Sequence, residues 1–231
     1  MRPSISNSHG TSVRDCYRAA FGSTARHPKC SSILSGGVLA TLLGRHVRLL
    51  ELESKTTRFL EVNDVNVVET LAVVAAPLGK YCALLQRATL PDSTDSIHQV
   101  AVVNLKLGKI VRTIRPNASL TTSTVIVDLS FSDAHSKNLV ISYGKPDPVV
   151  VTYRWYTEKV VGSVRLERVV LGVHFSPTAD TILTALTVNS LHELTQDLRK
   201  ESYNSRTLHE RPAVCPNSRI LVRSWRRVLT F

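Results

Sequence analysis

Residues Gly172-Val173-His174-Phe175-Ser176-Pro177 are the clearest copy of a layout that occurs three times in this chain. In each copy an apolar run ends at a turn-forming residue, and a second apolar run follows. The other copies are Leu71 to Pro77 before Tyr81, and Val127 to Asp133 before Leu139. The turn position recurs at Pro77, Asp133 and Pro177, in steps of 56 and 44 residues. Recurrence at this spacing indicates a repeat architecture.

Around these copies, from Ile33 to about Val188, short runs rich in Val, Ile, Leu and Thr are separated by clusters of Gly, Pro, Asp, Asn and Ser. This pattern predicts strands joined by tight turns. Connections this short favour antiparallel pairing over crossover helices. The predicted strands are 33–42, 46–52, 58–62, 70–75, 81–87, 99–105, 110–114, 125–130, 139–143, 149–155, 160–166, 169–175 and 181–187.

These strands group into units of four, with complete units at 70–114 and 125–166. Four-stranded propeller blades repeat at about 40–45 residues, and the longer step contains a polar insertion at 91–96. The predicted fold class is therefore all-β: a partial WD40-like β-propeller of about three to four four-stranded antiparallel blades. Closed propellers have four to eight blades. We expect a fragment of a longer protein, although the terminal regions or a second chain are alternative ways to complete a ring.

The charge is concentrated at the two ends of the chain. Residues 1–30 hold five basic residues and one acidic, and residues 199–231 hold eight basic and two acidic, whereas the remainder is nearly neutral. The predicted organisation is a basic N-terminal arm at 1–30, propeller blades at 31–198 and a basic C-terminal tail at 199–231. Within the blades, 190–198 fits either a short amphipathic helix or a strand.

No apolar stretch of about 18 residues is present, and the first thirty residues lack the apolar segment of a signal peptide. These features predict a cytoplasmic address and no membrane partner.

Catalytic and metal-binding patterns are not found. The chain has no GxSxG elbow, HExxH pair or kinase signature, and its four cysteines and eight histidines are dispersed. Three Gly-Lys pairs lack the rest of a phosphate loop, so we assign Gly79, Gly108 and Gly144 to hairpin turns that need positive φ. Asp128, like other acidic residues, is expected at a strand end or turn. We predict no catalytic residue, cofactor or metal ligand.

A candidate protein interface is the stretch from Ser142 to Tyr156, where polar, proline and aromatic residues gather. Trp, Tyr and Arg are the side chains that most often anchor interfaces. The candidate residues are Lys145, Asp147, Tyr153, Arg154 and Trp155. The alternative is that Tyr153 and Trp155 point inward and fill the gap between two blades.

Three places in the chain resemble a known family. They are Gly44 to Leu52 with Lys55 to Phe59, then Gly144-Lys145-Pro146-Asp147 leading to Trp155, and Val173 to Pro177 with Asp180-Thr181. Together they resemble the amino-terminal propeller of the cilia- and flagella-associated WD-repeat proteins, most of all the type 57 members, over about Ser32 to Leu194. The chain departs from the family pattern at Tyr143 and Pro148, and from Arg199 onward no match is seen.

The resemblance implies a non-enzymatic scaffold of the ciliary or flagellar axoneme. Its partners would be inner dynein arm components and the doublet microtubule, contacted through blade rims and tops. A general intracellular WD-repeat adaptor is the nearest alternative. An RNA-binding protein that uses the basic termini is a further alternative, although nucleic acid is not the expected partner.

Overall fold

The computed structural model describes residues 27–34, 36–60, 66–90, 95–116, 124–133, 136–146 and 148–210. Sixteen strands and no helix occur in these ranges. In chain order the strands are β1 (Ser31–Leu34), β2 (Val38–Leu43), β3 (His46–Glu51), β4 (Thr57–Leu60), β5 (Val67–Ala75), β6 (Tyr81–Thr89), β7 (Ser96–Asn104), β8 (Lys109–Ile114), β9 (Ile126–Phe131), β10 (Asn138–Tyr143), β11 (Val149–Arg154), β12 (Lys159–Arg165), β13 (Gly172–Ser176), β14 (Ala179–Leu186), β15 (Ser190–Asp197) and β16 (Ser202–Glu210).

Each successive set of four strands pairs antiparallel in sequence order. We name the sets blade 1 (β1–β4), blade 2 (β5–β8), blade 3 (β9–β12) and blade 4 (β13–β16). Blades 3 and 4 are also joined by one parallel bridge between Ser163 and Ser202. The predicted all-β, WD40-like propeller with about three to four antiparallel blades is confirmed.

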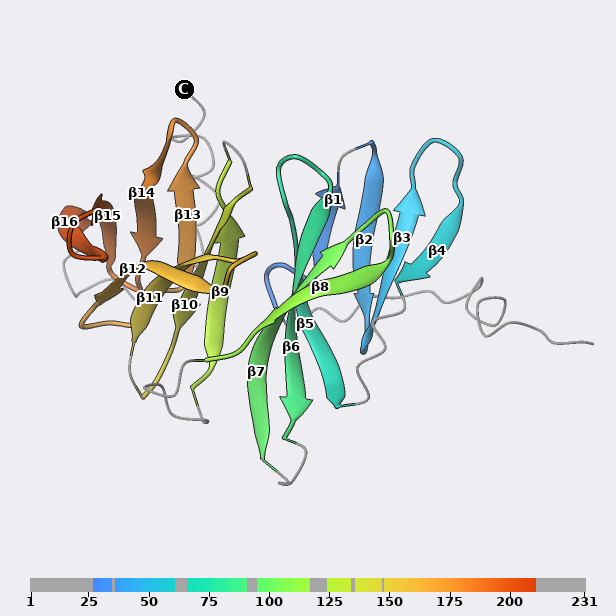
Figure 1. Cartoon of the computed structure of the whole chain (residues 1–231), viewed down its shortest axis with the longest axis horizontal. Helices are drawn as coiled ribbons and strands as arrows, with labels where there is room; N and C mark the ends of the chain where they lie inside the picture. The colour runs from blue at the N-terminus through green and yellow to red at the C-terminus, as the bar shows by residue number, and fades with distance from the viewer. Residues whose placement is uncertain are drawn as a thin grey trace, which may run out of the picture.

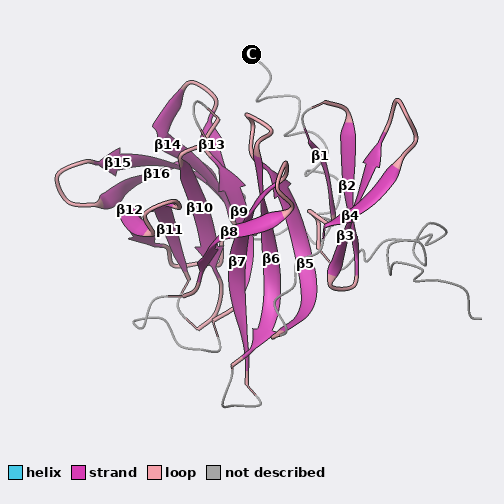
Figure 2. Ribbon diagram, turned by 45° about the vertical axis from the view of Figure 1, so that its right-hand side comes forward, coloured by secondary structure: helices cyan, strands magenta, loops and turns pink. Residues whose placement is uncertain are grey.

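The blades stand side by side in chain order (Figure 1), with blade 1 at one end of the row and blade 4 at the other. Their first strands are neighbours, because β1 contacts β5, β5 contacts β9 and β9 contacts β13. Figure 2 shows the same order from a second direction. The structure is therefore a row of blades around an inner edge made by the first strand of each. Within the described ranges, no helix is long and apolar enough to cross a membrane.

The two complete units predicted from the sequence are blades 2 and 3. In blade 1, the single strand expected over 33–42 is wrong: it is two strands, β1 and β2, because Gly36 and Gly37 both adopt positive φ and reverse the chain. In blade 4, residues 190–198 form strand β15 and not a helix.

Two predicted domain boundaries also change. Strand β16, at 202–210, pairs with β15 along its length, so the fold extends beyond residue 198 into the segment assigned to a basic tail. At the other end, His27 to Cys30 belong to the fold and not to a separate arm, because the backbone of Lys29 accepts a hydrogen bond from Val73 of β5. Net charge is a poor guide to where the fold ends, because a strand with one exposed face can carry many charged residues and still pair with its neighbour.

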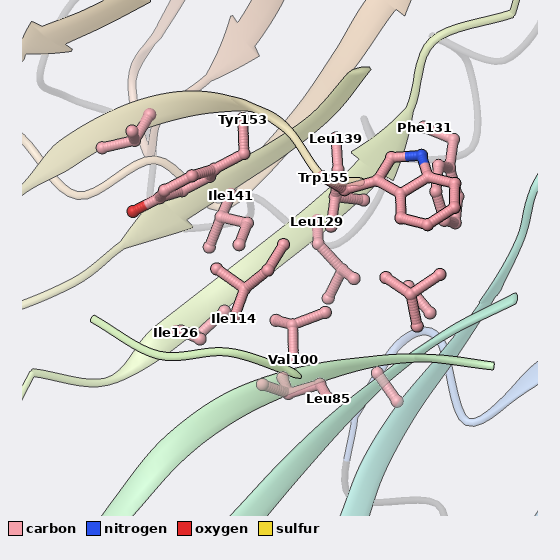
Figure 3. Packing of buried hydrophobic residues seen from close by; sticks show 14 of the residues in the cluster. Leu85, Val100, Ile114, Ile126, Leu129, Phe131, Leu139, Ile141, Tyr153 and Trp155 are labelled. Atoms are coloured by element: carbon pink, nitrogen blue, oxygen red, sulfur yellow. The ribbon is translucent and has the colours of Figure 1, made fainter. Parts of the chain in front are cut away.

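Three apolar layers hold the blades together, one at each blade junction. The layer between blades 2 and 3 contains the large side chains of blade 3 (Figure 3), with Leu129 and Ile141 facing Leu85 and Val100 of blade 2. Because a twisted sheet buries each face against a neighbouring sheet, the blades are stable as a stack and not singly.

Candidate interaction surface

An ion pair between a partly buried lysine and a buried aspartate lies where the inner strands meet. Lys29 Nζ is 2.8 Å from Asp128 Oδ1 and also donates to the Leu129 carbonyl at 2.7 Å. The other oxygen of Asp128 accepts the Val173 backbone N–H at 2.9 Å. Asp128 is only 3% exposed and lies inside strand β9, so its expected place at a strand end or turn is wrong. The carboxylate still binds a backbone amide, but the amide belongs to the next blade.

These bonds occupy both oxygens of the Asp128 carboxylate. They join the segment before blade 1 to β9 of blade 3, and β9 to β13 of blade 4. The arrangement serves to hold the inner strands in place and presents no free nucleophile or base. Among the described residues, no group of three or more His, Cys, Asp or Glu is placed to hold a metal ion.

The sequence-predicted interface residues fall into two groups. Tyr153 and Trp155 are 2% and 5% exposed and belong to the layer between blades 2 and 3. The Tyr153 hydroxyl lies 3.1 Å from that of Tyr143, and the Trp155 indole N–H donates to the Ser136 carbonyl at 2.6 Å. Burial raises the pKa of the Tyr143 and Tyr153 hydroxyls, so both remain neutral hydrogen-bonding groups. Tyr153 and Trp155 therefore point inward and fill the gap between two blades, which was the alternative to an interface role.

Lys145 and Arg154 are exposed, but the structure does not bring them together. Lys145 lies in the connection before β11, and Arg154 is the last residue of β11. They therefore lie at opposite ends of the same strand, on opposite rims of the blade. Asp147 lies outside the described residues. The role of these residues in partner binding stays a prediction.

At the Arg154 end of β11, the turns of blades 2 and 3 contact one another. We call this region the turn rim; it comprises the described residues of four turns, namely 76–80 (β5–β6), 105–108 (β7–β8), 132–133 and 136–137 (β9–β10), and 155–158 (β11–β12). The Leu78 backbone N–H donates to Ser136 Oγ at 3.4 Å, and the Leu105 N–H donates to the Lys80 carbonyl at 3.1 Å. The Tyr81 and Trp155 rings pack edge to face with centroids 4.9 Å apart. The four turns are thus fastened to one another around a buried indole.

The turn rim exposes large apolar side chains. Leu78 is 63% exposed, Leu107 is 65% exposed and Tyr156, whose ring packs against Trp155, is 41% exposed. Turn positions normally carry small or polar residues, so leucines at the tips of two adjacent turns are unusual. Exposed apolar residues gathered on a rigid base are typical of protein interaction sites. The arrangement can bind a partner surface.

Sequence reasoning missed Leu78 and Leu107, although each stands beside a glycine that it assigned to a turn. Gly79 and Gly108 do adopt φ of +65°, as expected for hairpin turns. The expectation of positive φ is wrong for Gly144, which is not among the positive-φ residues. A Cβ at Gly144 would lie 3.0 Å from Val127 Cγ2, so the close approach of β9 restricts this position. A leucine directly before a turn glycine, as in Leu78-Gly79 and Leu107-Gly108, is the sequence feature that could have identified these exposed residues.

Comparison with known proteins agrees with this architecture. No protein-family model and no curated protein sequence matches the chain. Among solved structures, it is similar to Kuenenia stuttgartiensis hydrazine synthase, with a TM-score of 0.56, 12% identity, and coverage of 74% of this chain and 54% of that one.

It is also similar to the β-propeller domain of Myceliophteria thermophila Cps50 (Swd1), with a TM-score of 0.54, 17% identity, and coverage of 80% of this chain and 56% of that one. The chain thus spans about half the length of these structures. At such identities the likeness shows the fold alone: the chain is an all-β WD40-like propeller of four described blades.

Proposed function

We propose that this chain is a non-enzymatic propeller scaffold that binds partner proteins through the turn rim. The observation that carries the proposal is the pair of leucines, Leu78 and Leu107, exposed at turn tips that hydrogen bonds and a buried indole hold in place. Rigid apolar side chains lose little conformational entropy when a partner covers them. The ion pair at the inner strands does not suggest a different function, because Lys29 and Asp128 are bonded to each other.

For the biological setting, we propose the ciliary or flagellar axoneme, with inner dynein arm components and the doublet microtubule as partners. This assignment rests on the sequence resemblance carried by Gly44 to Phe59, Gly144 to Trp155 and Val173 to Thr181. The fold agrees with it, since the resembling family has a propeller in this region. A scaffold in this position would help to anchor or regulate the dynein arms by contact alone.

The test is to express a tagged full chain in ciliated cells and follow it through detergent extraction of isolated axonemes. The chain should remain with the axoneme. The Leu78→Ser/Leu107→Ser variant should move largely into the soluble fraction, whereas Leu171→Ser/Val188→Ser, which alters exposed apolar residues of blade 4, should be retained. A wild-type chain that is fully extracted would remove the axonemal assignment and leave a general adaptor. Equal retention of both variants would remove the turn rim as the binding face.

A further inference from the structure

The turn rim carries an excess of positive charge that the fold does not neutralise. Five exposed cations stand at or beside its turns: Lys80, Lys106, Lys109, Lys137 and Arg154. None of the five forms an ion pair within the described part of the chain. Among the described residues of the turn rim, Asp133 is the only exposed carboxylate without a cation partner.

The remaining acidic group of the rim, Glu158, is already paired. Its Oε1 lies 3.6 Å from Arg112 Nη1 of β8, and both side chains are about half exposed. At the junction with blade 4, Lys159, the first residue of β12, is paired at 3.2 Å with Glu201 of the β15–β16 turn. At that turn, Asp197 lies 4.0 Å from Lys200. The described turns of blades 2 and 3 therefore keep an excess of unpaired positive charge, and the exposed leucines lie on two of these turns.

Charge and apolar surface together specify the chemistry of the partner. We propose that the turn rim binds an acidic polypeptide segment in which carboxylates alternate with apolar side chains. The carboxylates would meet the lysines and Arg154, and the apolar groups would cover Leu78, Leu107 and Tyr156. This inference rests on the proposed scaffold function and adds the kind of segment that the scaffold recognises.

A single-stranded nucleic acid would also meet the positive charge, but the apolar groups favour a polypeptide. Sequence-tolerant binding of bases uses exposed aromatic faces on which successive bases stack. On the described turn rim, only Tyr156 is an exposed aromatic, and Trp155 is buried beneath it. Aliphatic side chains such as Leu78 and Leu107 pack well against other aliphatic groups.

The experiment measures fluorescence anisotropy of the purified full chain with three labelled probes. One is a short peptide of glutamates interspersed with leucines, the second is the same peptide with each leucine replaced by serine, and the third is oligothymidylate of the same charge. The leucine-containing peptide should bind most tightly, and its affinity should fall as NaCl rises. Loss of its leucines should weaken binding roughly tenfold, because apolar burial is lost.

Variants locate the site. Lys106→Glu/Arg154→Glu should weaken binding of the glutamate-leucine peptide on the order of tenfold, since each of the two reversed charges changes an attraction into a repulsion. The matched control Arg45→Glu/Lys145→Glu alters exposed cations of the opposite rim and should leave affinity within about twofold. All of these side chains are exposed, and circular dichroism will confirm that each variant folds.

The outcomes separate this inference from the proposed function. Tighter binding of oligothymidylate, or equal losses in the two charge variants, would overturn the acidic-segment proposal. If the peptide fails to bind while the Leu78→Ser/Leu107→Ser chain still leaves the axoneme, the scaffold function stands and only the partner chemistry is wrong. If the peptide binds but the chain is not retained on the axoneme, the partner chemistry stands and the axonemal assignment is wrong.

Discussion

Replacement of Asp128 by Ala should destabilise the fold more than any surface change in this chain. The substitution removes the partner of Lys29 Nζ at 2.8 Å and the acceptor of the Val173 N–H at 2.9 Å. Leaving one member of a buried ion pair without its partner costs about 3–5 kcal/mol. Lys29 is 23% exposed at its side chain and keeps its bond to the Leu129 carbonyl, so the lower end of that range is expected.

Asp128→Asn is the informative companion because it keeps an oxygen for the Val173 N–H and removes only the charge. We expect it to lower the free energy of unfolding by about 1–3 kcal/mol. In a double-mutant cycle with Lys29→Met, the two substitutions should be coupled by at least about 1 kcal/mol, since each removes the same interaction.

The assay is urea denaturation followed by tryptophan fluorescence and circular dichroism in parallel. Coincident transitions would justify a two-state free energy. If Asp128→Ala unfolds within about 0.5 kcal/mol of the wild-type chain, the value expected for an ordinary surface change, the assignment of this pair as the link between inner strands is refuted.

Three further predictions concern the blade junctions. Tyr143→Phe or Tyr153→Phe alone should cost about 1–3 kcal/mol in urea denaturation, because one buried hydroxyl loses its partner, whereas the double substitution should cost less than the sum of the two. Gly162→Ala should lower the free energy of unfolding by about 1–3 kcal/mol, because the added Cβ would lie 2.8 Å from Tyr203 Cε2; normal stability would contradict the close packing of β16 on blade 3. Burial lowers the pKa of His98 below its ordinary value, so the unfolded chain takes up a proton at a higher pH than the folded chain. The free energy of unfolding should therefore fall as the pH drops through about 6.5. A His98→Gln variant whose free energy of unfolding falls with the same slope against pH would refute this.

Much of the blade architecture could be predicted because it depends on local pattern. The alternation of β-branched residues with turn residues located the strands of blades 2 and 3, and the repeated turn position gave the period. The strand β16 was missed because all its residues from Asn204 to Glu210 are exposed, which leaves no buried face to produce an apolar alternation. In blade 1, the reversal at Gly36-Gly37 was hidden inside an apolar run.

The candidate site was less predictable. Residues 145–155 were grouped because they are adjacent in sequence, but a strand separates its ends in space, so Lys145 and Arg154 lie on opposite rims. The turn rim instead joins residues from four turns, between Leu78 and Tyr156, that no short stretch of sequence contains.

The sequence by itself determined the class of this protein: short antiparallel strands in units of four, tight turns at glycine, and no recognisable catalytic motif. These properties follow from backbone preference and hydrophobic alternation, which act over a few residues. Only the tertiary structure decided which side chains are exposed and can contact a partner. Packing of blade 2 on blade 3 buried Tyr153 and Trp155 and left Leu78 and Leu107 exposed, and packing at the inner edge brought Lys29 to Asp128 across 99 residues of chain. Burial and charge pairing depend on contacts between distant segments, which local sequence pattern does not encode.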